Sequence, residues 1–159
     1  MQDSSPVRPA NIPEHSELGQ RGEELAAAYL EQCGYQIVAS NFTVPVGRNR
    51  NEAIVTVEID LVAYEGPILC FVEVKTRASD WFASPSANVD LRKQRQVMRA
   101  AGAYRRMFGL VNSAYRYDVL SIVLPSREEM PSCPRLELLR NFWSEERFRK
   151  RRAPERYWD

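Results

Sequence analysis

Histidine is almost absent from this sequence, and its cysteines are few. The 159 residues include one histidine, His15, and three widely spaced cysteines, Cys33, Cys70 and Cys133. A histidine-based catalytic triad, a histidine metal site and a CxxC zinc or redox motif therefore have almost no residues to draw on. We expect the cysteines to be packing residues and any chemistry to use carboxylates and lysines.

Long hydrophobic runs are also missing. The longest apolar stretch, roughly residues 67–72, is far shorter than the ~18 residues that a membrane span needs. The N-terminal segment lacks the basic and then apolar pattern of a signal peptide. The sequence therefore predicts a cytoplasmic protein with no membrane partner, folded as a single domain because a chain of this length buries enough surface without disulfides.

The sequence has little net charge, because 22 Lys+Arg stand against 21 Asp+Glu. The two signs are nevertheless separated along the chain. Residues 1–80 hold 12 acids and 6 bases, whereas residues 81–159 hold 9 acids and 16 bases. This asymmetry fits a surface that binds a polyanion, and it fits equally a solvated arginine face.

Hydrophobic periodicity predicts an α/β domain. We expect helices at 16–33 and 88–109, and strands at 35–44, 54–64, 68–75, 115–124 and 136–139. The turn at Gly66 makes an antiparallel hairpin, and the strand after the second helix must run parallel to an earlier one. The fold is therefore expected to be a central mixed β-sheet of four to five strands flanked by helices.

The domain boundaries follow from the composition of the two ends. Residues 1–16 are expected to form a flexible N-terminal arm, residues 17–140 the folded domain, and residues 141–159 a basic C-terminal tail. The run Arg147–Arg152 fits either a solvated helix end or an auxiliary phosphate contact.

Two local patterns add expectations about packing. Alternation in the second strand places one set of apolar residues on a single face: Val55, Val57, Ile59, Leu61 and Ala63. Gly19 and Gly22 weaken the first helix by about 1 kcal/mol each relative to alanine. We therefore expect each glycine to allow a close contact with another element.

Acidic residues and a lysine converge in the expected hairpin. Glu73 and Lys75 leave one face of their strand, and the neighbouring strand can place Asp60 beside them. Two carboxylates at such a short distance do not both stay ionised unless a cation lies between them. Oxygen ligands favour Mg²⁺ or Mn²⁺. The backbone carbonyl of Val74 is a further candidate ligand. A Glu–Lys or Asp–Lys ion pair at a strand end explains the same pattern without a metal.

The helices add further candidate residues. Glu23 falls at the border of the buried face of the first helix, and Lys93 projects with the apolar face of the second. Lys93 either approaches the carboxylates or snorkels to solvent. The arginines of this second helix gather on another side: Arg92, Arg95, Arg99 and Arg106.

Five ordered segments resemble the bacterial YraN family: GQRGEELA at 19–26, GYQI at 34–37, EIDLVA at 58–63, FVEVKTR at 71–77 and RYDVL at 116–120. The resemblance implies the restriction-endonuclease-like fold of the PD-(D/E)XK nuclease superfamily, and a similarity to archaeal Holliday-junction resolvases. The sequence departs from the family pattern at Thr43 and Val57, and its stretch between these residues is longer, with arginines displaced to Arg48 and Arg50.

The resemblance also implies roles for individual residues. Asp60 matches the metal-binding aspartate, Glu73 and Lys75 the (D/E)XK pair, and Glu23 an acidic residue that resolvase-like members add from the first helix. The implied activity is Mg²⁺- or Mn²⁺-dependent hydrolysis of DNA, branched or junction DNA included. The residues expected to contact nucleic acid are Arg77, Arg92, Lys93, Arg95 and Arg99.

Other functions fit the same residues. A non-catalytic protein that binds DNA or RNA would use the basic half alone. An adaptor that holds an acidic protein partner would use the same arginines. The similarity to resolvases also raises a homodimer as a possible assembly.

Overall fold

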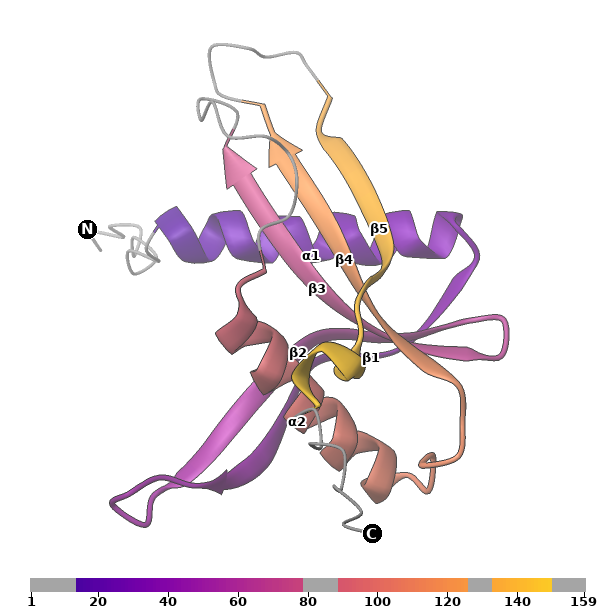
Figure 1. Cartoon of the computed structure of the whole chain (residues 1–159). Coiled ribbons are helices and arrows are strands. Elements are labelled where there is room, and N and C mark those ends of the chain that lie inside the picture. Colours follow the sequence, from indigo (N-terminus) through magenta and orange to yellow (C-terminus); the bar gives the residue numbers. More distant parts are fainter. Residues whose placement is uncertain (1–13, 79–88, 126–132, 150–159) are drawn as a thin grey trace, which may run out of the picture.

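The computed structural model describes residues 14–78, 89–125 and 133–149 (Figure 1). The elements are α1 (Glu14–Gln32), β1 (Tyr35–Arg48), β2 (Ile54–Glu65), β3 (Ile68–Ala78), α2 (Leu91–Met107), β4 (Tyr115–Leu124), β5 (Arg135–Trp143) and the 3₁₀ helix η2 (Glu145–Phe148). The N-terminal arm up to residue 13, most of the loop before α2 and the basic run beyond Arg149 lie outside the described residues. None of the helices in those described ranges is long and apolar enough to span a membrane.

The strands form one mixed sheet in the order β1-β2-β3-β4-β5. β1, β2 and β3 pair antiparallel, and Gly66 makes the turn between β2 and β3 at φ +57°. The connection through α2 returns the chain to the starting end of β3, so β4 pairs with β3 in parallel. β5 then pairs antiparallel with β4. The expected α/β architecture, a mixed sheet flanked by helices, is confirmed.

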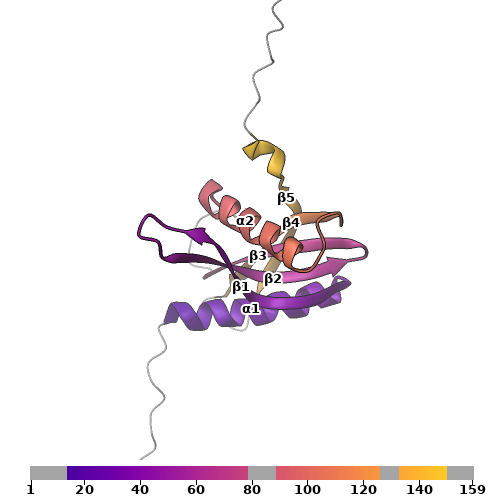
Figure 2. The same cartoon turned by 90° about the horizontal axis from the view of Figure 1, so that it is seen from below.

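The sheet lies between the two helices, with α1 on one face and α2 on the other (Figure 2). The core under α1 includes Ala26, Leu30, Leu61, Cys70, Val72 and Leu120. The core under α2 includes Ile59, Phe71, Val97, Ala101, Tyr104 and Val119. Alternation along β3 therefore directs Phe71 and Glu73 toward α2, and Val72 toward α1.

α1 approaches the sheet most closely at Gly22. A Cβ on this residue would lie 1.9 Å from the Thr76 Oγ1 and 2.9 Å from the Thr76 Cβ. Only glycine permits that approach, and it brings the next residue, Glu23, to the edge of the sheet. The expected close contact is confirmed at Gly22 and wrong at Gly19, where a Cβ would meet nothing within 4 Å.

The ends of α2 differ from expectation. The helix begins at Leu91, not at residue 88, because the Asp90 carboxylate caps it by accepting a hydrogen bond from the Lys93 amide at 2.7 Å. The helix ends at Met107, and Met107 and Phe108 are exposed rather than part of its buried face.

The first two strands extend further than the sequence indicated. β1 continues to Arg48 through Pro45, which an edge strand tolerates. Pairing of β2 with β3 begins only at Leu61, so residues 42–59 leave the sheet as a two-stranded β-ribbon (Figure 1). The point at which β2 separates from β3 is called the fork below.

The predicted alternation of β2 fails at the fork. Val57 and Ile59 pack in the core under α2, whereas Leu61 and Ala63 pack in the core under α1. Asp60 lies where the strand changes face. Opposite it in the β1–β2 register lies Asn41, whose φ of +51° is left-handed. This irregularity directs the Asp60 side chain into the fork rather than onto one face of the sheet.

The C-terminal part of the described chain continues the fold. Of the segment expected as a basic tail, residues 141–143 belong to β5 and residues 145–148 to η2. Trp143 is buried and stacks on Tyr117, with ring centroids 4.9 Å apart.

Candidate functional site

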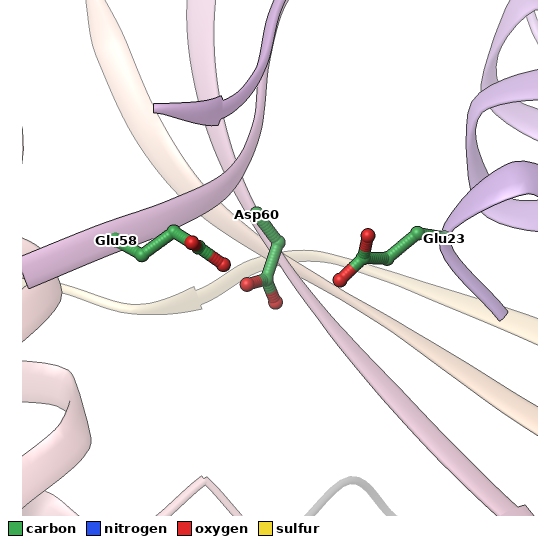
Figure 3. A group of neighbouring side chains, drawn as sticks. All are labelled: Glu23, Glu58 and Asp60. Atoms are coloured by element: carbon green, nitrogen blue, oxygen red, sulfur yellow. The ribbon is translucent and has the colours of Figure 1, made fainter. Parts of the chain in front are cut away.

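Three carboxylates from two elements meet at the fork (Figure 3). α1 contributes Glu23, and β2 contributes Glu58 and Asp60. One ligand oxygen of each lies within 4.8 Å of the others. Three acids this close repel one another when ionised, so the arrangement favours a bound cation.

Asp60 is the central member of the group. Its Oδ2 accepts a hydrogen bond from the Val74 amide at 2.8 Å, which ties β2 to β3 just past the last paired residue. Burial raises the pKa of Asp60 to about 7, and the neighbouring charges of Glu73 and Glu23 act in the same direction. The carboxyl group therefore lies in a site with an excess of negative charge.

Glu73 lies beside this group with one oxygen paired and the other unpaired. Its side chain is 4% exposed, and its Oε1 lies 3.4 Å from both the Lys75 Nζ and the Lys93 Nζ. Its Oε2 is buried and has no hydrogen-bond partner. A buried carboxylate oxygen without a partner is costly, and a coordinated cation would satisfy it.

A residue of β1, Asn41, holds the Glu23 side chain in place. The Asn41 Nδ2 donates a hydrogen bond to the Glu23 Oε2 at 3.0 Å. Asparagine adopts left-handed backbone angles more readily than most residues, which suits it to this position. The close contact at Gly22 and this hydrogen bond together fix the position of Glu23 against Asp60.

An open hollow of about 300 Å³ lies beside the carboxylates. Its lining combines the acids with one lysine and small or apolar neighbours: Leu18, Gly19, Glu23, Asp60, Glu73, Val74, Lys75 and Thr76. A phosphate group that entered this hollow would lie near the carboxylates and also near the Lys75 ammonium group.

The structure brings most of the sequence-predicted site residues together. Glu23, Asp60, Glu73 and Lys75 line one hollow, and Lys93 of α2 pairs with Glu73. Val74 lines the same hollow, and its amide donates a hydrogen bond to Asp60.

Sequence reasoning missed Glu58. The signal was available, because Glu58 precedes Asp60 by two residues in a strand and so leaves from the same side.

The arginines expected to contact nucleic acid occupy different positions. Arg77 is half-buried near the end of β3, and Arg92 is exposed on the first turn of α2. Arg95 lies over the Phe148 ring, 5.3 Å from its centroid. Arg99 donates a hydrogen bond to the Val46 carbonyl at 2.5 Å. Arg77 thus lies on β3 and the other three on α2, and none of them lines the hollow.

The residues present fit a divalent cation. The available donors are carboxylate oxygens, which Mg²⁺ and Mn²⁺ prefer. The Glu73–Lys75 ion pair, the alternative explanation from the sequence, is present as well. It accounts for the Oε1 of Glu73 but leaves the unpartnered Oε2 and the three-carboxylate group unexplained.

The fold and site define an α/β protein in which a mixed sheet between two helices carries a carboxylate cluster at a strand fork. Residues 22–122 match the model of the uncharacterised protein family UPF0102, and the chain belongs to this family. The matched segment contains every carboxylate and lysine of the site and ends before β5.

Bacterial relatives support this assignment. A UPF0102 protein of Geobacter sulfurreducens is 40% identical over 124 residues, which cover 78% of this chain and 86% of the relative. One from Chlorobium chlorochromatii is 42% identical over 113 residues, which cover 71% of this chain and 79% of the relative. One from Alkaliphilus metalliredigens is 34% identical over 113 residues, which cover 71% of this chain and 90% of the relative.

Proposed function

We propose that this protein is a Mg²⁺- or Mn²⁺-dependent nuclease that hydrolyses DNA phosphodiester bonds, with a restriction-endonuclease-like fold of the PD-(D/E)XK class. The observation that carries the proposal is the three-carboxylate group of Glu23, Glu58 and Asp60, beside a buried Glu73 with one unpartnered oxygen. The resemblance of the Asp60, Glu73 and Lys75 segments to that superfamily supports the same assignment.

The proposed roles follow from position. Asp60 would hold the ion together with Glu23, Glu58 and the free oxygen of Glu73. A divalent cation in such a site supplies an activated water and polarises a phosphate oxygen.

The lysines act on either side of Glu73. Lys75 lines the hollow and stabilises negative charge that develops on the phosphate. Lys93 approaches the same Glu73 oxygen from α2 and orients that carboxylate.

Metal binding is tested first. Asp60→Asn should weaken Mn²⁺ binding at least about tenfold in titration calorimetry, because it removes the central ligand. Glu24→Gln is the matched control, since Glu24 is the exposed neighbour of Glu23 and should leave Mn²⁺ affinity unchanged. Equal Mn²⁺ affinity in wild type and Asp60→Asn would exclude the site.

Cleavage is tested on linear, flapped and four-way-junction DNA with Mg²⁺ or Mn²⁺. Lys75→Ala should keep Mn²⁺ binding and lose cleavage by about 10² or more, because it removes a charge that acts on the phosphate rather than an ion ligand. Salt-sensitive DNA binding without cleavage under either metal would instead identify a non-catalytic nucleic-acid-binding protein. Failure to bind any DNA or RNA at low salt would favour an acidic protein partner.

A further inference from the structure

One face of the β-ribbon is exposed and leads away from the carboxylate group. Alternate residues of the ribbon pack under α2, among them Phe42, Val44 and Val57. The residues between them are exposed: Thr43, Pro45, Arg48, Ile54, Thr56 and Glu58. Ile54, near the tip, is 61% exposed. This face runs from Glu58, a member of the carboxylate group, to the turn that joins β1 and β2.

The charge along this face changes sign from one end to the other. Between Arg21 and Lys75 the sequence has only two basic residues, Arg48 and Arg50, and both lie at the ribbon tip. The face between Glu58 and the tip carries no charged side chain, and its threonines offer hydroxyl donors. Between the turn, which holds Glu52, and Glu58, a phosphate backbone laid along this face would meet no acidic side chain.

The turn at the tip is held in one conformation. The Asn49 Oδ1 accepts hydrogen bonds from the amides of Asn51 and Ala53, at 2.9 and 3.0 Å. The Arg48 Nη1 donates to the Glu52 carbonyl at 2.6 Å. Arg50 therefore projects from an ordered turn, and little backbone conformational entropy is lost when it binds a ligand.

α2 braces the ribbon from its other face. The Arg99 Nη2 donates a hydrogen bond to the Val46 carbonyl at 2.5 Å, and a Cβ on Gly47 would lie 3.0 Å from the same nitrogen. Gly47 has φ +146°, which side chains rarely adopt. The ribbon is thus positioned relative to the fork, so the distance between its tip and Asp60 is set by the fold.

We propose that the β-ribbon binds the phosphate backbone of duplex DNA on one side of the carboxylate group, with Arg48 and Arg50 contacting phosphates about six base pairs from the bond that is cut. The six residue-to-residue steps from Ile54 to Asp60 span about 20 Å at ~3.3 Å per step. Duplex DNA rises ~3.4 Å per base pair, which gives the distance of about six pairs. The position of the cut rests on the proposed nuclease function, whereas the ribbon–DNA contact does not.

The contact is tested by fluorescence anisotropy with a labelled duplex of ~30 base pairs, across a NaCl series, using the full chain. The double variant Arg48→Ala/Arg50→Ala should bind about tenfold more weakly at moderate salt. The slope of log K against log salt should fall by about 2, close to 0.9 per lost phosphate contact. Arg50→Ala alone leaves the hydrogen bonds of the turn in place, and it should lower the slope by about 1, half of the decrease expected for the double variant.

The matched control is the double variant Arg21→Ala/Arg135→Ala, which removes two exposed arginines outside the ribbon and outside α2 and should bind within about twofold of wild type. Mn²⁺ calorimetry should be unchanged in every variant, and thermal melting should be unchanged in those that keep the Arg48 hydrogen bond to Glu52. Unchanged DNA affinity in the Arg48/Arg50 double variant would overturn the proposal. Tighter ribbon-dependent binding of duplex RNA than of duplex DNA would overturn the choice of DNA.

The distance is tested by the products of cleavage from an end-labelled duplex. For one of the two labels, 5′ or 3′, the shortest product of the wild type should be about six base pairs, because on the side of the cut that the ribbon covers a nearer end leaves the tip without DNA to bind. The Arg48/Arg50 double variant should also release shorter products. Identical product lengths would overturn the distance. A wild type that binds DNA through the ribbon but neither binds Mn²⁺ nor cleaves would instead refute the nuclease function.

Discussion

At the scale of single residues, the position of Glu23 depends on the absence of a side chain next to it. A Cβ on Gly22 would overlap Thr76, so Gly22→Ala must push α1 away from β3. Overpacking of this kind costs about 1–3 kcal/mol, more than the ~1 kcal/mol that alanine gains in a helix. We expect Gly22→Ala to lower the free energy of unfolding in urea and to weaken Mn²⁺ binding through the displaced Glu23.

Gly19→Ala is the control within the same helix. Its Cβ would meet nothing within 4 Å, so only the helix propensity changes. The variant should be more stable than wild type by up to ~1 kcal/mol and should bind Mn²⁺ normally. Destabilisation of both variants by the same amount would contradict a specific contact at Gly22.

At the scale of elements, a charged network joins β2, β4 and β5 at the end of the sheet away from the fork. Glu65 on β2 accepts hydrogen bonds from Arg116 and from Arg140, the latter at 2.8 Å. Arg116 also donates to the buried Asp118, to which the Tyr35 hydroxyl donates at 3.1 Å. The network ties β2, whose other part carries Glu58 and Asp60, to β4 and β5.

Glu65 makes this network sensitive to acid. Hydrogen bonds from Arg140 and then from Arg116 lower the pKa of Glu65 from 4.5 to about 2. A carboxylate with a depressed folded-state pKa adds stability that is complete above about pH 4.5 and is lost as the pH falls toward 2. Glu65→Gln should therefore be less stable than wild type by about 1–2 kcal/mol near neutral pH, and the difference should shrink below about pH 3.

Urea unfolding of both proteins across this pH range measures the difference. Glu24→Gln, which removes an exposed carboxylate from α1, controls for the general effect of one lost charge. A Glu65→Gln deficit that is constant with pH would show that the network acts by packing alone.

The sequence predicted some elements better than others, for physical reasons. Alternation and a glycine turn identified β2, β3 and their hairpin, and β4 was placed at its observed bounds. β1 was predicted to end at Val44, before a loop that contains Gly47, because local pattern does not show that β1 is an edge strand, which tolerates Pro45. The β-ribbon was missed for this reason.

The site was predicted in part. The spacing of Glu73 and Lys75 and the border position of Glu23 correctly indicated residues that the structure brings together. Glu58 was overlooked although regular alternation already places it on the side of Asp60, and the change of face at Asp60 was not predicted at all. Such a break depends on the left-handed Asn41 opposite it and on the Val74 amide, both distant in sequence.

At the scale of the whole molecule, the small net charge hides an arrangement in which acids and bases are separated in space. The carboxylate group lies at the fork, and exposed arginines lie on α2 and at the ribbon tip. In the proposed function a polyanion must approach a cluster of negative charges while the arginines attract it. A divalent cation bound at the fork offsets the charge of the carboxylates, so that attraction by the arginines exceeds repulsion by the acids.

Asp60→Asn separates the two effects in DNA binding. With EDTA and low salt at about pH 8, the variant should bind duplex DNA up to about fivefold more tightly than wild type, because a charge some 4 Å from a phosphate repels it by about 1 kcal/mol. With Mg²⁺ the order should reverse, since only wild type holds the ion. Glu24→Gln should match wild type in both buffers, because Glu24 lies outside the carboxylate group. Weaker binding by Asp60→Asn in EDTA would show that DNA does not approach the fork.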